Sequence, residues 1–433
     1  MKTIRNLLKI KALLLFFLGI TLSSLLPSPA APSEKKDIVS VAKSPQLEAR
    51  LQPLSLDCLF EWEGRIYILA GPRDIETLDR KGIPYAIESD KFPALDRGPA
   101  TIQSGINGDY HSCAELESDL EALARVHPQT ARLFTIGLSL EGRKITALKI
   151  SDNVDLDEPE AEVLFLGCHH AREWISVEVP FLLAKHLLEN YASDAAIRAA
   201  VDQSEIWIVP LVNPDGLEYS IRHYRYWRKN RRLNADGSFG VDLNRNYGYG
   251  WAYDDQGSSP VPASEIYRGT AAFSEPETRA VRDFFAQREF QALVSYHSYS
   301  QIILYPWGYT TAPTDKDALH EALAAEMSLL MEAANGRVYG FGPAAASLYL
   351  TNGDTTDWAF GTAGIPAFTI ELPPIDQLGG GFFNAELDIM PIFRENLPAA
   401  LYLINWSISN FSASKPTSRK KDVDKRPASG LMN

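Results

Sequence analysis

Cysteine, continuous basic charge and internal repeats are scarce in this sequence, and each shortage excludes a class of protein. The three cysteines, Cys58, Cys113 and Cys168, are odd in number and widely spaced. They therefore form neither a disulfide framework nor a cysteine zinc cluster. The formal net charge is −13, and no long basic stripe interrupts the middle of the chain. Nucleic acid is therefore not an expected partner.

Long apolar runs are also missing once the N-terminus has been passed. The chain opens with the basic stretch MKTIRNLLKIK, continues with the apolar ALLLFFLGITLSSLL, and then reaches the small residues PSPAAP. An apolar run of about 15 residues is short for a bilayer span of ~20, and this layout is typical of a secretory signal peptide. We expect residues 1–31 to be a signal peptide. The mature protein is then secreted or periplasmic, and it has no membrane contact after the signal is removed.

The remainder divides into a small segment, a large domain and a tail. Residues 32–98 predict a small α+β segment that is either a pro-segment, cut near Arg97, or a permanent accessory domain; we favour the pro-segment. Apolar strands such as EVLFLG alternate with amphipathic helices through residues 99–411, which predicts an α/β domain with helices on both faces of a sheet. The polar, charged residues 412–433 predict a disordered tail.

Charged side chains are densest in GCHHAREW, directly after the strand EVLFLG. A hydrolytic zinc site needs three protein ligands and one open position. Glu173 lies three residues after His170 and four after His169, so the spacing alone allows either histidine as its partner. His297, after the strand FQALV, is the candidate third ligand, because open α/β sheets bind at strand ends.

Other polar residues complete a possible hydrolytic site. Asn244 and Arg245, in VDLNRNYG, suit a substrate carboxylate, since guanidinium matches a carboxylate in a bidentate fork. Arg228 lies in YWRKNRR, which by itself also fits a basic surface patch. Glu371 ends the apolar strand AFTIE, where a carboxylate is unusual enough to indicate a function as a base.

Taken in order, the motifs resemble the zinc carboxypeptidase family typified by pancreatic carboxypeptidases A and B, and its bacterial member carboxypeptidase T more closely still. They are HHAREW, NPDG, YWRKNR, GVDLNRNYG, SYHSYSQIILYPWGY, SLYLTNGDTTDW and FTIEL. The resemblance implies a mixed, mostly parallel twisted sheet of about eight strands. It also implies a secreted carboxypeptidase with one Zn²⁺ per chain that hydrolyses the C-terminal peptide bond of peptides and proteins.

The resemblance also assigns roles residue by residue. It implies zinc ligation by His170, Glu173 and His297, with His169 as a packing or supporting neighbour. It implies that Glu371 is the general base, and that Arg228 stabilises the oxyanion. The substrate contacts that it implies are made by Asn244 and Arg245 at the terminal carboxylate, by Tyr349, which closes over the substrate, and by Arg172 and Tyr299 in the next subsite.

Specificity and partners are less constrained. In the family, the position of Thr356 lines the pocket for the C-terminal side chain, and threonine there speaks against a purely basic preference. Asp354 fits either that pocket or a turn, so we expect mixed specificity for apolar and basic ends.

Calcium is possible, as in some bacterial relatives, but its ligands are not located. A monomer is expected, with an activating protease as a candidate partner. The alternatives are a peptidoglycan-peptide or other amide hydrolase, and a non-enzymatic zinc-binding protein.

Overall fold

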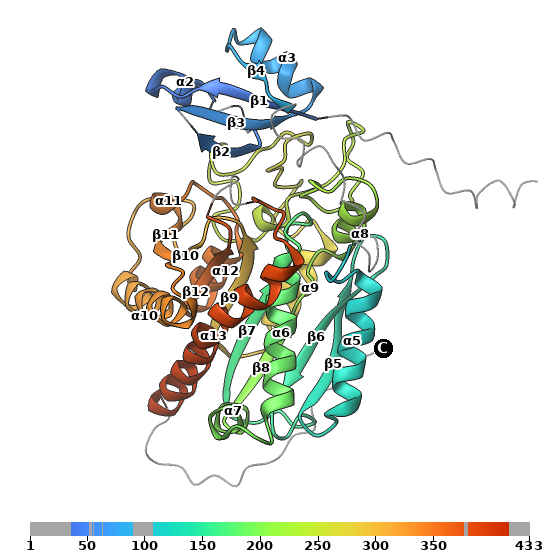
Figure 1. Cartoon of the computed structure of the whole chain (residues 1–433), viewed down its shortest axis with the longest axis vertical. Helices are drawn as coiled ribbons and strands as arrows, with labels where there is room; N and C mark the ends of the chain where they lie inside the picture. The colour runs from blue at the N-terminus through green and yellow to red at the C-terminus, as the bar shows by residue number, and fades with distance from the viewer. Residues whose placement is uncertain are drawn as a thin grey trace, which may run out of the picture. The chain divides into compact units, whose positions relative to one another are not determined.

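The computed structural model in Figure 1 describes residues 36–51, 54, 56–62, 64–89, 107–375 and 380–414. The predicted signal peptide, the cut expected near Arg97 and the tail beyond residue 414 lie outside these ranges. Within them the chain forms two sheets with their helices. Among the described helices, none combines the length and apolar character that a membrane crossing requires.

The larger sheet has eight strands in the order β11-β10-β12-β9-β7-β8-β6-β5. The four central strands run parallel to one another, namely β12 (Ala367–Leu372), β9 (Phe290–Ser298), β7 (Ala161–Gly167) and β8 (Ser204–Val209). The outer strands are β11 (Gly340–Pro343), β10 (Ile302–Tyr305), β6 (Lys144–Ile150) and β5 (Ala131–Leu138). Of these, β11 is parallel to β10, whereas β10, β6 and β5 are antiparallel to their inner neighbours.

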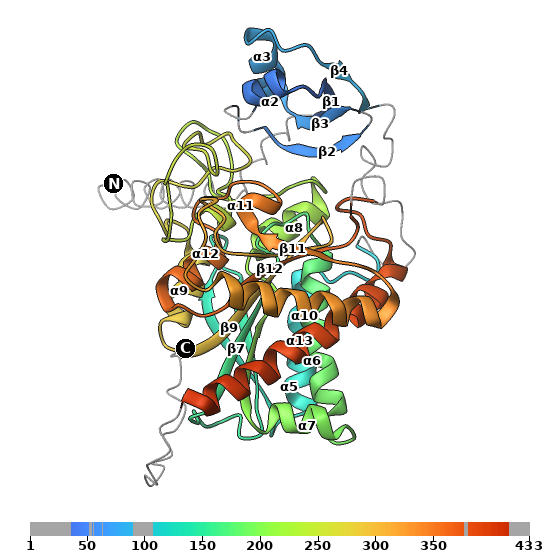
Figure 2. The same ribbon diagram turned by 90° about the vertical axis from the view of Figure 1, so that its left-hand side faces the viewer.

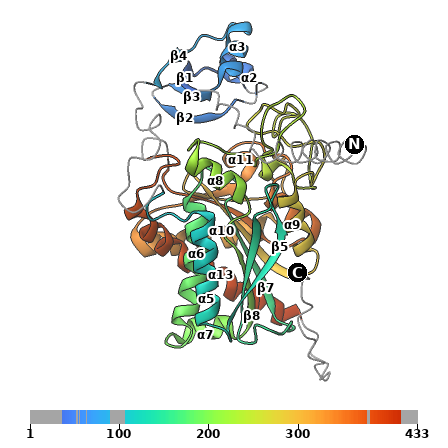
Figure 3. The same cartoon turned by 90° about the vertical axis from the view of Figure 1, so that its right-hand side faces the viewer.

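Helices cover both faces of this sheet. One apolar core joins it to α5 (Cys113–Val126), α6 (Ile175–Asn190), α7 (Ala195–Val201), α8 (Pro214–Arg222), α10 (Asp317–Asn335) and α13 (Glu386–Ser414). A second core packs α9 (Pro276–Phe285) and α12 (Thr355–Ala363) on the opposite face. Figure 2 shows α10 and α13 crossing one another, and Figure 3 shows α9 on the far side of the sheet from α5 and α6. The predicted α/β class with a mixed, mostly parallel sheet is confirmed.

Local sequence explains why these elements form. Every residue of β7, AEVLFLG, is buried, as expected for a strand covered on both faces. Helix α5 begins after Ser112, whose side chain accepts a hydrogen bond from Glu115 N while Glu115 bonds back to Ser112 N. This reciprocal capping satisfies two backbone donors at the helix start. Ser112 therefore fixes where α5 begins.

The smaller sheet has the order β2-β3-β1-β4. Its strands are β1 (Asp37–Ala42), β2 (Cys58–Trp62), β3 (Arg65–Ala70) and β4 (Ala86–Ile87), and its helices are α2 (Pro45–Leu51) and α3 (Pro72–Arg80). It has an apolar core of its own, which includes Val39, Ile68 and Leu78. The prediction of an α+β segment agrees with these elements, although β1 was not anticipated. Both sheets belong to one compact unit that begins at Lys36.

One boundary and one strand differ from the predictions. Helix α13 continues to Ser414, three residues past the predicted end of the domain at 411. Strand β11, GFGP, was also not anticipated, because a short segment with two glycines and a proline has no apolar alternation to reveal it. Two very short helices, η3 (Leu243–Arg245) and α11 (Ala344–Ser347), complete the described elements.

Candidate active site

The site lies where the central parallel strands end. Strand β7 stops at Gly167, and Cys168 then turns the chain with a φ of +52°. Strand β9 ends just after His297, and Glu371 of β12 pairs directly with His297 in the register of the two strands. Because parallel strands bring their carboxyl ends to one edge of a sheet, loops distant in sequence meet here.

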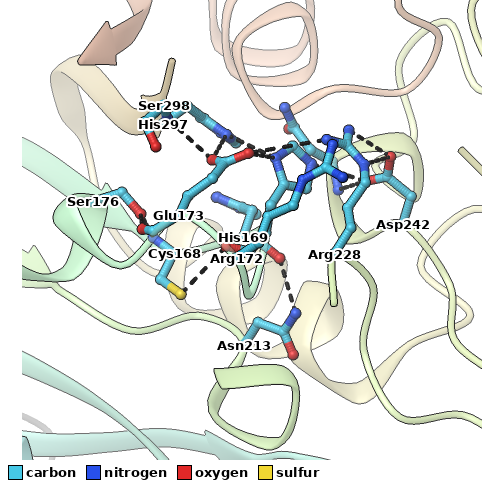
Figure 4. Close-up of polar contacts among 12 residues, drawn as sticks. Cys168, His169, Arg172, Glu173, Ser176, Asn213, Arg228, Asp242, His297 and Ser298 are labelled. Atoms are coloured by element: carbon cyan, nitrogen blue, oxygen red, sulfur yellow. Dashed lines mark hydrogen bonds and ion pairs between the residues drawn. The ribbon is translucent and has the colours of Figure 1, made fainter. Parts of the chain in front are cut away.

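His170, Glu173 and His297 converge at this edge of the sheet. The Nδ1 atom of His170 is 2.8 Å from one Glu173 oxygen, and Nδ1 of His297 is 3.0 Å from the other. The two Nδ1 atoms are 3.1 Å apart, and all three side chains are buried. Figure 4 shows the Glu173 carboxylate turned toward His297, with Arg228 and Asp242 paired beside it.

This donor set fits a zinc ion. Two imidazole nitrogens and one carboxylate are the ligands of many catalytic zinc sites, and their facing atoms lie within 4.8 Å of one another. Burial acts to raise the pKa of Glu173, but His170 and His297 hold it well below its usual range. The carboxylate is therefore ionised, as a metal ligand must be.

The structure separates the two adjacent histidines that spacing left equivalent. His170 faces Glu173, whereas the ring of His169 points to Tyr247, with 2.8 Å between Nε2 and the phenol oxygen. His169 is completely buried, and burial lowers its pKa, as do His297 and His170. His169 is thus outside the candidate metal set.

Asp242 is a site residue that the sequence reasoning missed. Its Oδ1 lies 3.1 Å from Nε2 of His170, and its Oδ2 accepts bonds from Arg228 Nε at 3.0 Å and Nη2 at 2.8 Å. Metal-binding histidines commonly donate their second nitrogen to a carboxylate. The signal available in the sequence was the aspartate of VDLNRN, two residues before the predicted Asn244.

Glu371 lies beside the candidate metal ligands. It is 8% exposed, and burial raises its pKa to about 8; Glu173 adds to this effect, while His297 opposes it. A buried carboxyl whose proton affinity is tuned toward neutral pH is suited to acid–base chemistry.

Asn244 and Arg245, in η3, form a second polar group. Asn244 Oδ1 accepts bonds from Thr355 N at 2.9 Å and from Thr355 Oγ1 at 2.7 Å. Arg245 bonds through Nε to Gly257 O and through Nη1 to Asn244 O, both at 2.8 Å. Tyr349 is 48% exposed, and its ring centroid is 6.0 Å from Arg245 Cζ. The structure therefore brings Tyr349 close to the pair predicted to hold a carboxylate.

Arg172 and Tyr299 both contact Phe382. The ring centre of Phe382 lies 4.1 Å from Arg172 Cζ and 4.8 Å from the ring centre of Tyr299. The Arg172 guanidinium is already engaged by a residue of the small α+β segment. Nη1 and Nη2 donate to the two oxygens of Asp57 at 2.7 and 3.1 Å, and both side chains are buried. A fork-to-fork pair of this kind combines charge with precise geometry.

Asp354 is the N-cap of α12, which corresponds to the turn role rather than the pocket role among the two that the sequence allowed. Its Oδ1 accepts from Asp357 N at 2.8 Å and from Thr356 Oγ1 at 3.0 Å, and its Oδ2 accepts from Thr351 Oγ1. An ionised carboxylate has about four acceptor positions. These bonds therefore leave room for one further donor at Asp354.

Comparison with known proteins places this geometry in context. The family profile described as zinc carboxypeptidase matches residues 116–399. A zinc carboxypeptidase of Saccharothrix mutabilis subsp. capreolus is 31% identical over 401 residues, covering 88% of this chain and 91% of the relative. Carboxypeptidase A1 of Bos taurus is 33% identical over 304 residues, covering 70% of this chain and 71% of the relative.

Solved structures agree with these sequence relatives. Bovine thrombin-activatable fibrinolysis inhibitor, in complex with tick carboxypeptidase inhibitor, has a TM-score of 0.64 at 31% identity, covering 70% of this chain and 98% of that one. Another structure of thrombin-activatable fibrinolysis inhibitor has a TM-score of 0.71 at 26% identity, covering 87% and 99%. The nearer resemblance to carboxypeptidase T stays a prediction.

Proposed function

Because the chain belongs to the zinc carboxypeptidase family and is a metallocarboxypeptidase, we propose that it releases single residues from the C-termini of peptides and proteins in an extracytoplasmic compartment. The observation that carries the proposal is the buried set of His170, Glu173 and His297 beside Glu371. These three ligands would hold a zinc ion, which would polarise the scissile carbonyl and lower the pKa of water to about 7.

The side chains divide the remaining chemistry. Glu371 takes the proton of the attacking water and later delivers it to the leaving amine. Arg228 donates to the oxygen that becomes negative as water adds, a type of donor whose loss costs about 10²–10³ in rate. Asp242 fixes the guanidinium of Arg228 through two bonds. The donor is therefore oriented before substrate arrives.

Restriction to the last peptide bond follows from the second polar group. Asn244 and Arg245 hold the terminal carboxylate, and the exposed Tyr349 closes over it. Arg172 and Tyr299 contact the residue on the other side of the scissile bond. A substrate without a free terminal carboxylate loses the charge-assisted bonds that set its register.

We propose mixed specificity, with Asp354 as the element that admits basic ends. The single acceptor position left on its carboxylate suits one ammonium or guanidinium N–H. Asp354 is only 4% exposed, so an apolar side chain can pass without meeting a large charged surface. The variant Asp354→Asn tests this role: it should release Arg and Lys more slowly and Phe and Leu at the wild-type rate. An equal loss of rate for all four residues would show that Asp354 serves only as the helix cap.

We propose that residues 32–98 are an inhibitory pro-segment. Asp57 occupies Arg172, the residue proposed to bind substrate. Lys36 pairs with Glu265, and Ile38, Tyr67 and Leu69 pack in one apolar cluster with Tyr226 and Phe382. Relatives that cover 87–88% of the chain extend well beyond the family profile at 116–399, which supports a segment of shared origin. An activating protease would cut the connection near Arg97.

We also propose a structural cation of the calcium class in the loop before β7. This loop supplies the group Asp152–Glu158–Glu160, and its Asp157 forms a second group with Glu162 of β7 and Glu205 of β8; each group has ligand oxygens within 4.8 Å of one another. Among the described residues, one buried oxygen in each of Asp152, Glu160, Glu162 and Glu205 has no hydrogen-bond partner. Buried oxygens without a donor are costly unless a cation satisfies them, and calcium prefers oxygen ligands. Calcium should raise the Tm of the wild type but not of Asp152→Asn/Glu160→Gln; equal shifts in both would contradict the site.

The function is tested by hydrolysis of blocked dipeptides that end in Phe, Leu, Arg, Lys or Glu, each paired with its C-terminal amide. The intact precursor and protein trimmed near residue 98 are assayed with and without 1,10-phenanthroline. We expect chelator-sensitive release of Phe, Leu and Arg from the free acids after trimming only. Equal cleavage of the amides would contradict a carboxypeptidase. Bound zinc without any release would indicate a different amide substrate or a binding protein.

A further inference from the structure

His169 is a buried histidine that has no role in the proposed mechanism. It is adjacent to the metal ligand His170, but its ring faces away from Glu173. Its exposure is 0%, and its ring stacks on that of His297 with centroids 5.5 Å apart and an interplanar angle of 13°. Both ring nitrogens have polar neighbours.

These neighbours form a continuous series. Ser295 Oγ lies 3.1 Å from Nε2 of His297 and 3.3 Å from Nδ1 of His169. On the other side of the ring, Nε2 of His169 lies 3.2 Å from Thr355 Oγ1 and 2.8 Å from the Tyr247 phenol. Thr355 in turn donates to Asn244.

One direction of hydrogen-bond donation joins the whole series. His297 offers Nδ1 to the metal set, so its Nε2 carries the proton and donates to Ser295. The Ser295 hydroxyl then donates to Nδ1 of His169, which leaves His169 Nε2–H to donate to Thr355. The Thr355 hydroxyl donates its own hydrogen bond to Asn244 Oδ1 at 2.7 Å. In the opposite tautomer the Tyr247 hydroxyl would donate to Nε2 and the contact with Thr355 would join two acceptors, so the link to Thr355 requires the proton on Nε2 of His169.

We propose that His169 is a positioning residue that links the metal ligand His297 to the carboxylate-binding residue Asn244, through Ser295 and Thr355. The inference rests on the proposed function, since it assigns His169 to the orientation of two groups of that mechanism. The link fixes which way the Asn244 amide points. With Oδ1 held by Thr355, the amide N–H₂ is left to donate to the terminal carboxylate of the substrate.

A packing role is the competing explanation, because the ring fills space between His297 and Tyr247. Three substitutions separate the two. His169→Phe keeps a ring but removes both nitrogens. His169→Asn places an amide near the position of Nδ1, on the Ser295 side. His169→Gln places one near the position of Nε2, on the Thr355 side.

Two binding measurements report on the two ends of the link. Zinc affinity is measured by competition with a chromophoric chelator, and carboxylate affinity by calorimetric titration with 3-phenylpropionate. Loss of a group that supports a metal ligand typically lowers affinity or activity 10–100-fold. We expect His169→Phe to weaken both affinities by about 10-fold. His169→Asn should recover mainly zinc binding, and His169→Gln mainly carboxylate binding and the KM for peptides.

Two flanking variants serve as matched controls. Ser295→Ala should weaken zinc binding more than carboxylate binding, and Thr355→Val should do the reverse. Unchanged affinities in a folded His169→Phe protein would overturn the proposal, as would equal behaviour of the Phe, Asn and Gln variants. If His169→Phe does not fold, the contrast between Asn and Gln still decides. A wild-type protein that releases no C-terminal residue rejects the proposed function itself, whereas an active wild type with unaffected variants rejects only the link.

Discussion

The buried pair between Asp57 and Arg172 allows a quantitative test of the proposed pro-segment. Asp57→Asn keeps the shape of the side chain but removes its charge, which leaves Arg172 without a counter-ion in a buried place. Removing one partner of a buried ion pair costs about 3–5 kcal/mol. At the lower figure, the fraction of chains with the segment displaced should rise by about 100-fold.

The assay is the rate of Phe release by the uncut precursor, expressed as a fraction of the rate after trimming. Trimming removes residue 57, so the trimmed enzymes are identical and provide an internal reference. Arg73→Gln is the matched control on the same segment, because Arg73 and Asp236 form an exposed pair at 3.7 Å. Such pairs contribute about 0–1 kcal/mol, so we expect less than a five-fold change.

Two results would refute the reasoning. In one, the folded Asp57→Asn precursor stays within two-fold of the wild-type precursor, so the ion pair does not hold the segment on the cleft. In the other, Arg73→Gln activates as strongly as Asp57→Asn, so the effect belongs to general loosening of the segment. Mass spectrometry must show that each precursor is uncut during the assay.

Three further predictions concern single residues. Glu371→Gln should lower kcat by at least 10²-fold and leave zinc affinity within a few-fold, measured by initial rates and chelator competition; loss of both would make Glu371 a structural residue. Asp242→Asn should lower zinc affinity about 10-fold through His170 and also lower kcat through Arg228; wild-type values for both would show that neither needs the carboxylate. Burial alone would lower the pKa of His111, but Glu178 and Asp119 raise it to about 9, above its unfolded value of ~6.5. The charged imidazole therefore stabilises the fold by about 2 kcal/mol below pH ~6.5, and this stabilisation is lost as pH rises through 9. The free energy of unfolding of His111→Gln, measured with denaturant, should be lower than that of the wild type at pH 6 but equal to it at pH 10. The same difference at both pH values would contradict the prediction.

The sequence predicted the elements whose apolar pattern is strong. β7 is buried throughout, and the amphipathic α5 begins at the capping Ser112, because such patterns follow from local burial and hydrogen bonding. β1 and β11 were missed for different reasons. β11 is four residues of GFGP, whereas β1 gains its place only by pairing with β3 and β4.

The residues of the candidate site also differ in whether the sequence could predict them. His170, Glu173 and His297 could be proposed from spacing and strand ends once the resemblance had chosen between His169 and His170. Asp242 could not, since its contact with His170 spans 72 residues and an aspartate in a loop usually serves the loop itself. The pairing of Arg172 with Asp57, 115 residues earlier, likewise depends on tertiary structure.

The pairing of Glu371 with His297 in neighbouring strands ties the site to the sheet itself. Side chains in a strand alternate between faces, so a slip of one residue in β12 would turn the proposed base to the opposite side of the sheet. The same backbone bonds that align β12 with β9 thus set the position of the base relative to the metal ligand. The proton transfer proposed for Glu371 therefore depends on strand alignment, because a shift in this register would separate the proposed base from the candidate metal ligands.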